Sequence, residues 1–164
     1  MLELYYSIES TCGQKVRLIL AEKSFEWRER LLNLRMGEQF APDYLRLNPK
    51  GVVPTLVHDG HVIPESSLIC EYLDEVFPDV ALVPRDAYQK TRMRMWSKLI
   101  DEQIFEATRE ISFSAHFRAR MQGMSEEQRQ RRFNNVGDPE RTARYTEIFE
   151  QGTDSHYVLE SVAD

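Results

Sequence analysis

The stretch GVVPTLVHDGHVIPESSLICEYL, residues 51–73, determines the fold that we predict for this chain. Its apolar runs 54–58 and 61–64 flank Asp59-Gly60, a dipeptide typical of a two-residue hairpin turn in which both residues have positive φ. From Ser66 onward the apolar residues recur at helical spacing, until Pro78 ends the pattern. This part of the sequence therefore predicts an antiparallel hairpin followed by a helix.

The segments before this stretch predict the rest of a mixed sheet. Residues 2–6, LELYY, favour a strand, and residues 12–23 have the apolar spacing of a helix. Residues 25–32 alternate apolar and charged side chains, as a half-buried strand does, and a second, shorter helix is expected from 37 to the residue before Pro49. The order β-α-β-α-β-β-α is the thioredoxin architecture, a right-handed βαβ unit followed by a hairpin and a closing helix.

After residue 88 the pattern is helical throughout. A long helix is expected over 88–122, SEEQ at 125–128 matches a capping box that begins another, and Asp138-Pro139 begins a third. The fold class is therefore α/β, with a thioredoxin-like N-terminal domain at 1–79 and an all-α C-terminal domain at 88–164. Residues 156–162 begin a fourth helix where the chain stops, so we expect the helical domain to be incomplete.

The composition narrows the class of function. Of the 164 residues, 41% are hydrophobic and 29% charged, which is typical of a folded globular protein. The net charge of -6 argues against a nucleic-acid partner, and no apolar run approaches the ~20 residues of a membrane span. The two cysteines indicate no disulfide framework, and the histidines show no metal-ligand spacing with them. We expect a cytoplasmic protein without a metal or a membrane segment.

Ser10-Thr11-Cys12 lies where the first strand is expected to give way to a helix. The unsatisfied N–H groups and the positive dipole end of a helix N-terminus favour an anion such as a thiolate. A hydrogen bond from the Ser10 hydroxyl, at ~1.5–3 kcal/mol for a charged partner, lowers the pKa of a bound thiol by roughly one to two units. The alternative is that Ser10 only caps the helix. Both interpretations stay open at this point.

Two further pairs of residues suggest a peptide site. If the bond between Val53 and Pro54 is cis, the backbone of Val53 faces the open side and can pair with an extended peptide; an ordinary trans proline at a strand start is the alternative. Glu65-Ser66 combines a carboxylate, which can pair with an ammonium group, and a helix N-terminus with a hydroxyl, which can bind a carboxylate. Together this pair suits the zwitterionic end of an amino acid, although Glu-Ser alone is more often a simple cap.

The combination resembles the glutathione S-transferase family, most closely in NPKGVVPTL (48–56) and ESSLICEYLDEVFP (65–78). The resemblance covers nearly the whole chain. It implies that glutathione is the co-substrate, that Val53 before Pro54 pairs with its cysteinyl backbone, and that Glu65 and Ser66 hold its γ-glutamyl end. It also implies a small electrophile as second substrate, a role in detoxification and a homodimer.

The subclass is less defined. Ser10 falls where zeta- and theta-like members have a serine and omega-like members a cysteine, whereas Cys12 falls where beta-class members have theirs. DGHVIPESSLICEYLDEVFPD with MRMWSKLIDEQ also resembles bacterial β-etherase-type members, which cleave aromatic ethers with glutathione. We therefore expect a transferase in which Ser10 stabilises the glutathione thiolate. The alternatives are a glutaredoxin-like thiol-disulfide oxidoreductase that uses Cys12, and a non-catalytic glutathione-binding or interaction module.

The end of the chain departs from the family pattern. The helical domain of the family normally continues through several more helices, whereas this sequence ends at YVLESVAD. Either the chain is a truncated form or a dimer partner covers the apolar surface that remains.

Overall fold

The computed structural model describes residues 1–134 and 138–163. The chain divides into two compact units, Met1–Met93 and Arg94–Asp164, and each is described here by itself. The predicted domain limits at residues 79 and 88 stay a prediction.

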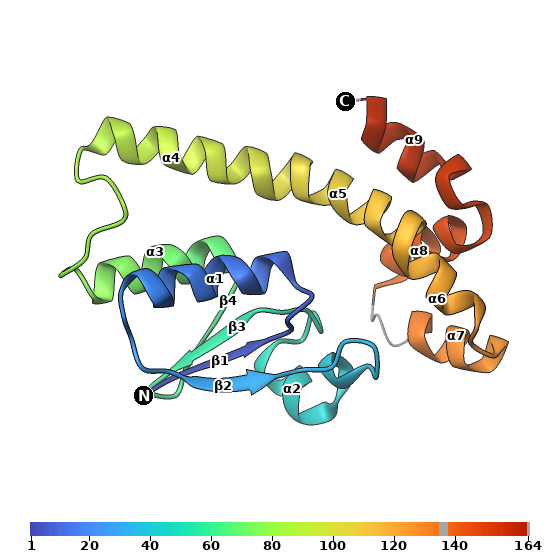
Figure 1. Cartoon of the computed structure of the whole chain (residues 1–164), viewed down its shortest axis with the longest axis horizontal. Coiled ribbons are helices and arrows are strands. Elements are labelled where there is room, and N and C mark those ends of the chain that lie inside the picture. Colours follow the sequence, from blue (N-terminus) through green and yellow to red (C-terminus); the bar gives the residue numbers. More distant parts are fainter. Residues whose placement is uncertain (135–137, 164) are drawn as a thin grey trace. The chain divides into compact units, whose positions relative to one another are not determined.

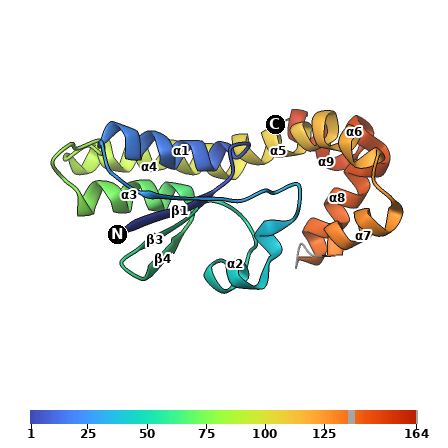
Figure 2. The same cartoon turned by 60° about the horizontal axis from the view of Figure 1, so that its bottom comes forward.

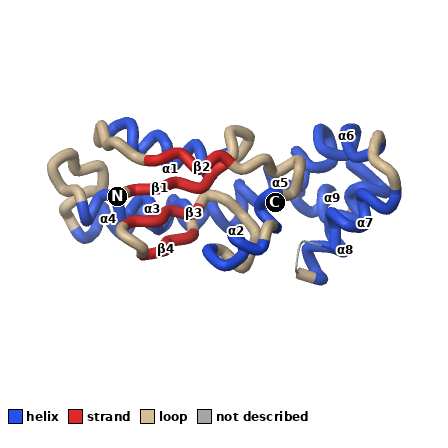
Figure 3. The backbone as a smooth tube through the Cα atoms, turned by 90° about the horizontal axis from the view of Figure 1, so that it is seen from below, coloured by secondary structure: helices blue, strands red, loops and turns tan. Residues whose placement is uncertain are grey.

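The first unit contains a four-stranded mixed sheet with helices on both faces. Its elements are β1 (Leu2–Tyr6), α1 (Thr11–Glu22), β2 (Arg28–Leu31), α2 (Pro42–Leu47), β3 (Thr55–His58), β4 (His61–Pro64) and α3 (Ser66–Val76) (Figure 1). The strand order is β2-β1-β3-β4, with β2 parallel to β1 and the other two pairs antiparallel (Figure 3). This is the thioredoxin-like arrangement that the sequence predicted.

The hairpin and its closing helix form as the sequence indicates. Asp59 and Gly60 have φ of 49° and 85°, the positive values that a tight hairpin turn requires. Helix α3 ends before Pro78, and its buried side chains include Ile69 and Leu73.

The core of the first unit lies between the sheet and one pair of helices. Helices α1 and α3 lie side by side on one face of the sheet, and α2 lies on the other (Figures 1 and 2). The fully buried side chains come from both strands and helices: Leu4, Val16, Leu20, Leu56, Ile69 and Leu73. The loops at the ends of the strands are thereby held on a rigid layer.

A buried ion pair joins α1 to α3. The Lys23 ammonium lies 2.8 Å from the Asp74 carboxylate, and the two side chains are 1% and 9% exposed. Lys23 also donates to the carbonyls of Phe77 (2.9 Å) and Val80 (2.6 Å). Asp74 accepts the backbone N–H groups of residues 82 (2.8 Å) and 83 (3.1 Å), so the segment after α3 is fastened to the helices by both members of the pair.

The predicted short helix over 37–48 is interrupted. A 3-10 turn covers Glu38–Phe40, Ala41 is extended, and α2 begins at Pro42. The cause is Pro42, because the residue before a proline is disfavoured in the helical region. Pro42 itself suits the first position of a helix, where its missing N–H is not needed.

The second unit is helical, and α4 (Ala87–Leu99) leads into it. Its α-helices are α5 (Phe105–Ser112), α6 (Arg118–Gln122), α7 (Glu126–Asn134), α8 (Pro139–Gln151) and α9 (His156–Ala163). The stretch predicted as one long helix consists of α4, α5 and α6 with two π-helical segments between them, Ile100–Ile104 and Phe113–Phe117. The predicted capping box is present, since Ser125 and Gln128 exchange hydrogen bonds of 3.0 and 3.3 Å.

Among the residues that the structure describes, no helix combines the length and the apolar character that crossing a membrane requires.

Candidate functional site

The register of the sheet brings three distant segments to one edge. Tyr5 stands opposite Thr55, and Thr55 stands opposite Pro64. The chain therefore leaves β1 toward Ser10, enters β3 from Val53 and leaves β4 toward Glu65 at the same end of the sheet. The residues that the sequence singled out are brought to a common end by strand pairing, although they are far apart in the sequence.

Ser10 caps helix α1. Its Oγ accepts the backbone N–H of Gly13 at 3.1 Å, and its φ and ψ of -88° and 115° are those of a capping residue. A hydroxyl has one proton to donate and two lone pairs, so this hydrogen bond leaves the Ser10 proton available for a ligand. Capping and thiolate stabilisation are therefore compatible roles.

The first turns of α1 and α3 provide a favourable environment for an anion. Neither helix has an acidic residue in its first turn. The Lys15 ammonium of α1 donates to Ser67 Oγ of α3 at 2.5 Å, so a positive charge links the beginnings of the two helices. Cys12 is half-buried in the first turn of α1. The helix end, the lysine and the dipole all favour negative charge here.

Val53 offers backbone groups beside this helix end. The bond from Val53 to Pro54 is cis, Pro54 is buried and Val53 is half-buried. Within residues 1–134 and 138–163, no hydrogen bond is made by the N–H or C=O of Val53. These two groups are arranged as a short free edge that an extended peptide can pair with.

A buried polar network holds the loop before Val53. The Tyr44 hydroxyl donates to the carbonyl of Val52 at 2.5 Å and lies 2.9 Å from Thr55 Oγ1. Asn48 Nδ2 donates to the same carbonyl at 3.0 Å and to Thr55 Oγ1 at 3.1 Å. Burial raises the pKa of Tyr44 to about 12, although the hydrogen bonds from Thr55 and Asn48 oppose that shift, so the phenol stays protonated at neutral pH.

Glu65 and Ser66 form the junction between β4 and α3. Ser66 is buried at the first position of the helix, whereas the Glu65 side chain is exposed and its carboxylate lies 2.7 Å from the Lys50 ammonium. Glu65 has a φ of 72°, a left-handed conformation that costs a non-glycine residue about 1–3 kcal/mol. Strained positions of this kind concentrate at ligand sites, which supports a binding role for this residue.

Sequence reasoning missed the residues that support the site. Lys50, Tyr44 and Asn48 were not selected. Tyr44 lies in α2, and Asn48 is the extended residue that follows it, with its N–H donating to the carbonyl of Tyr44 at 2.9 Å. The Lys23–Asp74 pair gave no signal, because charged residues near helix ends are usually solvated. In the part of the chain that the structure describes, no group of three or more His, Cys, Asp or Glu side chains is placed to hold a metal ion.

The open end of this thioredoxin-like sheet combines a helix-capping hydroxyl, a free backbone edge and an exposed carboxylate. These are groups that can bind a small zwitterionic peptide with an anionic centre. Comparison with known proteins specifies the family. Residues 9–76 match the model of the glutathione S-transferase N-terminal domain, a range that includes every site residue named above.

The relatives agree with this match. Protein LigF of Sphingobium sp. is 34% identical over 147 residues, which are 88% of this chain and 57% of LigF. Glutathione S-transferase Z1 of Arabidopsis thaliana is 40% identical over 89 residues, which are 54% of this chain and 40% of that protein. The crystal structure of beta-etherase LigF from Sphingobium sp. strain SYK-6 superposes with a TM-score of 0.88 at 32% identity, covering 99% of this chain and 68% of that one.

This chain belongs to the glutathione S-transferase family. It spans about half the length of the curated relatives that it matches.

Proposed function

We propose that this chain binds reduced glutathione at the open end of the sheet and directs its thiolate at an electrophilic, aromatic substrate. The observation that carries the proposal is the Ser10 hydroxyl, which caps α1 through its oxygen and keeps its proton to donate. The membership in the glutathione S-transferase family supports the identity of the thiol.

Each group of the site has a role in this proposal. The backbone of Val53, before Pro54, pairs with the cysteinyl residue of glutathione, and the thiol then lies near the N-terminus of α1. Glu65 pairs with the γ-glutamyl ammonium, while Ser66 and the N-terminus of α3 bind the γ-glutamyl carboxylate. Ser10 donates a hydrogen bond to the thiolate, which lowers the thiol pKa. The protein positions and activates the nucleophile and does not act as a general base.

The substrate class that we favour is an aryl ether. Two comparisons, at 34% and 32% identity, are with LigF, whose structure is described as a beta-etherase. In the proposed step the glutathione sulfur attacks the carbon that bears the aryloxy group. A C–S bond forms, the C–O bond breaks, and the phenolate leaves with the electron pair and takes a proton from water. No oxidant or reductant is required.

The first test is an ultraviolet titration of glutathione in the presence of the protein, from about pH 5 to pH 9, a range that spans the free thiol pKa of ~8.5. Thiolate absorbance that appears one to two units below that value supports binding and activation together. Turnover of aryl ethers is then measured with glutathione in excess. Glutathione that binds with an unshifted thiol contradicts the role of Ser10.

The second candidate is thiol-disulfide exchange through Cys12. The observation that favours it is the position of Cys12 in the first turn of α1, where the helix end stabilises a thiolate. A Cys12→Ala change abolishes disulfide exchange with glutathione under this candidate and leaves etherase turnover unchanged under the first.

We further infer a cytoplasmic homodimer with a detoxifying role, built from domains at 1–79 and 88–164. The support is the family membership together with the composition of the chain. Light scattering of the purified chain tests the dimer, and limited proteolysis between residues 79 and 88 tests the domain limits.

A further inference from the structure

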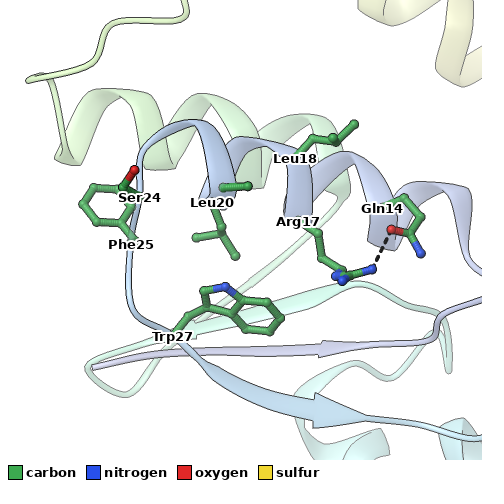
Figure 4. Close-up of a pocket in the computed structure, with 8 residues that line it drawn as sticks. Gln14, Arg17, Leu18, Leu20, Ser24, Phe25 and Trp27 are labelled. Atoms are coloured by element: carbon green, nitrogen blue, oxygen red, sulfur yellow. Dashed lines mark hydrogen bonds between the residues drawn. The ribbon is translucent and has the colours of Figure 1, made fainter.

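A hollow of about 390 Å³ lies between α1 and the segment that leads into β2, outside the proposed glutathione site. Leu20 and Trp27 face each other across it, and the Arg17 guanidinium lies beside the Trp27 indole (Figure 4). Gln14, Leu18 and Phe25 also line the hollow. The hollow thus combines aromatic and aliphatic walls with one cation.

Arg17 has no acidic partner there. Its Nη1 donates to Gln14 Oε1 at 2.8 Å, and its guanidinium carbon lies 5.2 Å from the centre of the Tyr6 ring. Its Nε is shielded from solvent and has no hydrogen-bond partner, and no carboxylate forms an ion pair with Arg17 in the described ranges 1–134 and 138–163. The Glu29 carboxylate accepts the Tyr6 hydroxyl at 2.5 Å, but it forms no ion pair with Arg17 in the described residues.

Two contacts orient the guanidinium. Its carbon lies over the Tyr6 ring, and one of its N–H groups donates to Gln14. Gln14 is itself fixed, because its Nε2 donates to the carbonyl of Ile8 at 2.8 Å. A pre-oriented guanidinium binds a planar carboxylate with two parallel hydrogen bonds at little further cost in side-chain entropy.

The walls of the hollow determine which kind of group the ligand carries beside its carboxylate. Trp27 and Phe25 offer ring faces and edges, and the exposed Leu18 adds aliphatic surface. The volume lies in the ~300–1,000 Å³ range of small-molecule sites and suits one or two fused rings. We propose that this hollow binds an aromatic carboxylic acid in its ionised form, with the carboxylate on Arg17 and the ring against Trp27. The site is separate from the one proposed for glutathione.

The test uses the whole chain and the probe 2-naphthoate, with the neutral 2-naphthamide as its isostere. Isothermal titration is carried out with saturating S-methylglutathione present, which occupies the proposed glutathione site without a reactive thiol. We expect 2-naphthoate to bind at least 10-fold more tightly than the amide, with the same affinity whether or not S-methylglutathione is present. Equal binding of acid and amide, no binding of the acid, or competition with S-methylglutathione overturns the proposal.

Two matched variants locate the ligand. Arg17→Met removes the charge and keeps the length of the side chain, so we expect at least a 10-fold loss of 2-naphthoate affinity and no change for the amide. Arg28→Met removes the same charge from an exposed residue of β2 that does not line the hollow, and it leaves the affinity unchanged. An unchanged affinity in Arg17→Met contradicts the proposal. If that variant does not fold, the comparison of acid with amide on the unaltered chain decides.

Discussion

Ser10 Oγ accepts the N–H of Gly13 at 3.1 Å, so one side chain ends the loop after β1 and begins helix α1. Glycine suits position 13, since a Cβ there would make a tight contact of 3.3 Å with the carbonyl oxygen of Ser7. This places the Ser10 hydroxyl at the positive end of the helix, where the glutathione thiolate is proposed to lie.

Replacing Ser10 separates its two roles. Ser10→Ala removes both the cap and the donor, so we expect a stability loss of about 1 kcal/mol and a rise of roughly one to two units in the pKa of bound glutathione. Ser10→Asp keeps a capping oxygen but, when ionised, has no proton to donate. We expect near-normal stability with the same or a larger rise in the thiol pKa. Ultraviolet titration and urea unfolding measure the two effects. If the thiol pKa of glutathione bound to either variant equals its value with the unaltered chain, the donor role of Ser10 is contradicted.

Glu65→Gln tests the proposed ammonium contact. The carboxylate now pairs with Lys50 at 2.7 Å, and both side chains are exposed, so the change should not disturb the fold. We expect the KM for glutathione to rise roughly 10- to 100-fold with kcat nearly unchanged, because a charged hydrogen bond of ~1.5–3 kcal/mol in binding is lost. Glu75→Gln, an exposed carboxylate on the same helix, is the control. Similar KM values for the two variants would contradict the proposed contact between Glu65 and the ammonium group of glutathione.

Tyr44→Phe tests the support of the Val53 loop. The change leaves the partly buried carbonyl of Val52 with one donor, Asn48, in place of two. We expect a stability loss of about 1–3 kcal/mol and a higher KM for glutathione, since the backbone of Val53 is no longer held in one position. Steady-state kinetics and urea unfolding measure both. An unchanged KM together with lower stability would show that the network serves the fold alone.

Lys23→Met leaves the carboxylate of Asp74 buried and without its cation. Breaking one member of a buried pair costs about 3–5 kcal/mol, whereas an exposed pair contributes about 1 kcal/mol or less. We therefore expect a large drop in the urea midpoint for Lys23→Met. Arg46→Met, which breaks the exposed pair with Asp43, should have little effect. Equal effects of the two changes would contradict the assigned burial.

The pair also predicts a dependence of stability on pH. Burial opposes the charge on Asp74, but hydrogen bonds from Lys23 and from two backbone N–H groups outweigh it and hold the pKa of Asp74 below its usual 3.8. A lowered carboxyl pKa contributes stability above the unfolded value, and that stability is lost as pH falls through the folded value. Asp74→Asn should therefore flatten the fall in unfolding free energy below about pH 4. An unchanged slope would contradict the shift.

The sequence was sufficient for most of the fold. The periodicities, the Asp59-Gly60 turn and Pro78 are local signals, and each element that they predicted in the first unit is present. The strand predicted over 25–32 is shorter and more exposed than expected, since β2 covers only Arg28–Leu31 at the edge of the sheet. The interruption of the helix near Ala41 has a local cause too, because Pro42 disfavours the helical region in the residue before it. The π-helical segments in the second unit had no such signal, because they change hydrogen bonding without changing the apolar pattern.

The candidate site was only partly predictable. Ser10 and Ser66 were identified because helix ends have sequence signatures. Lys50 and Tyr44 were missed because their contacts depend on how the loop before β3 folds back on α2 and on Glu65. Arg17 was missed for a related reason: a cation on a helix is normally solvated, and only its position over Tyr6 distinguishes it.

The contacts of Lys23 and Asp74 determine where this protein can be divided and recombined. A fragment that ends at Val76 retains every residue proposed to touch glutathione, yet it removes the carbonyl acceptors of Phe77 and Val80 and the N–H donors of residues 82 and 83. A chimera that exchanges the helical segment with that of a relative should therefore be spliced after residue 83. A graft made directly at the end of α3 would replace the segment that hydrogen-bonds to Lys23 and Asp74 with a linker from another protein. The buried pair would then lose these backbone partners.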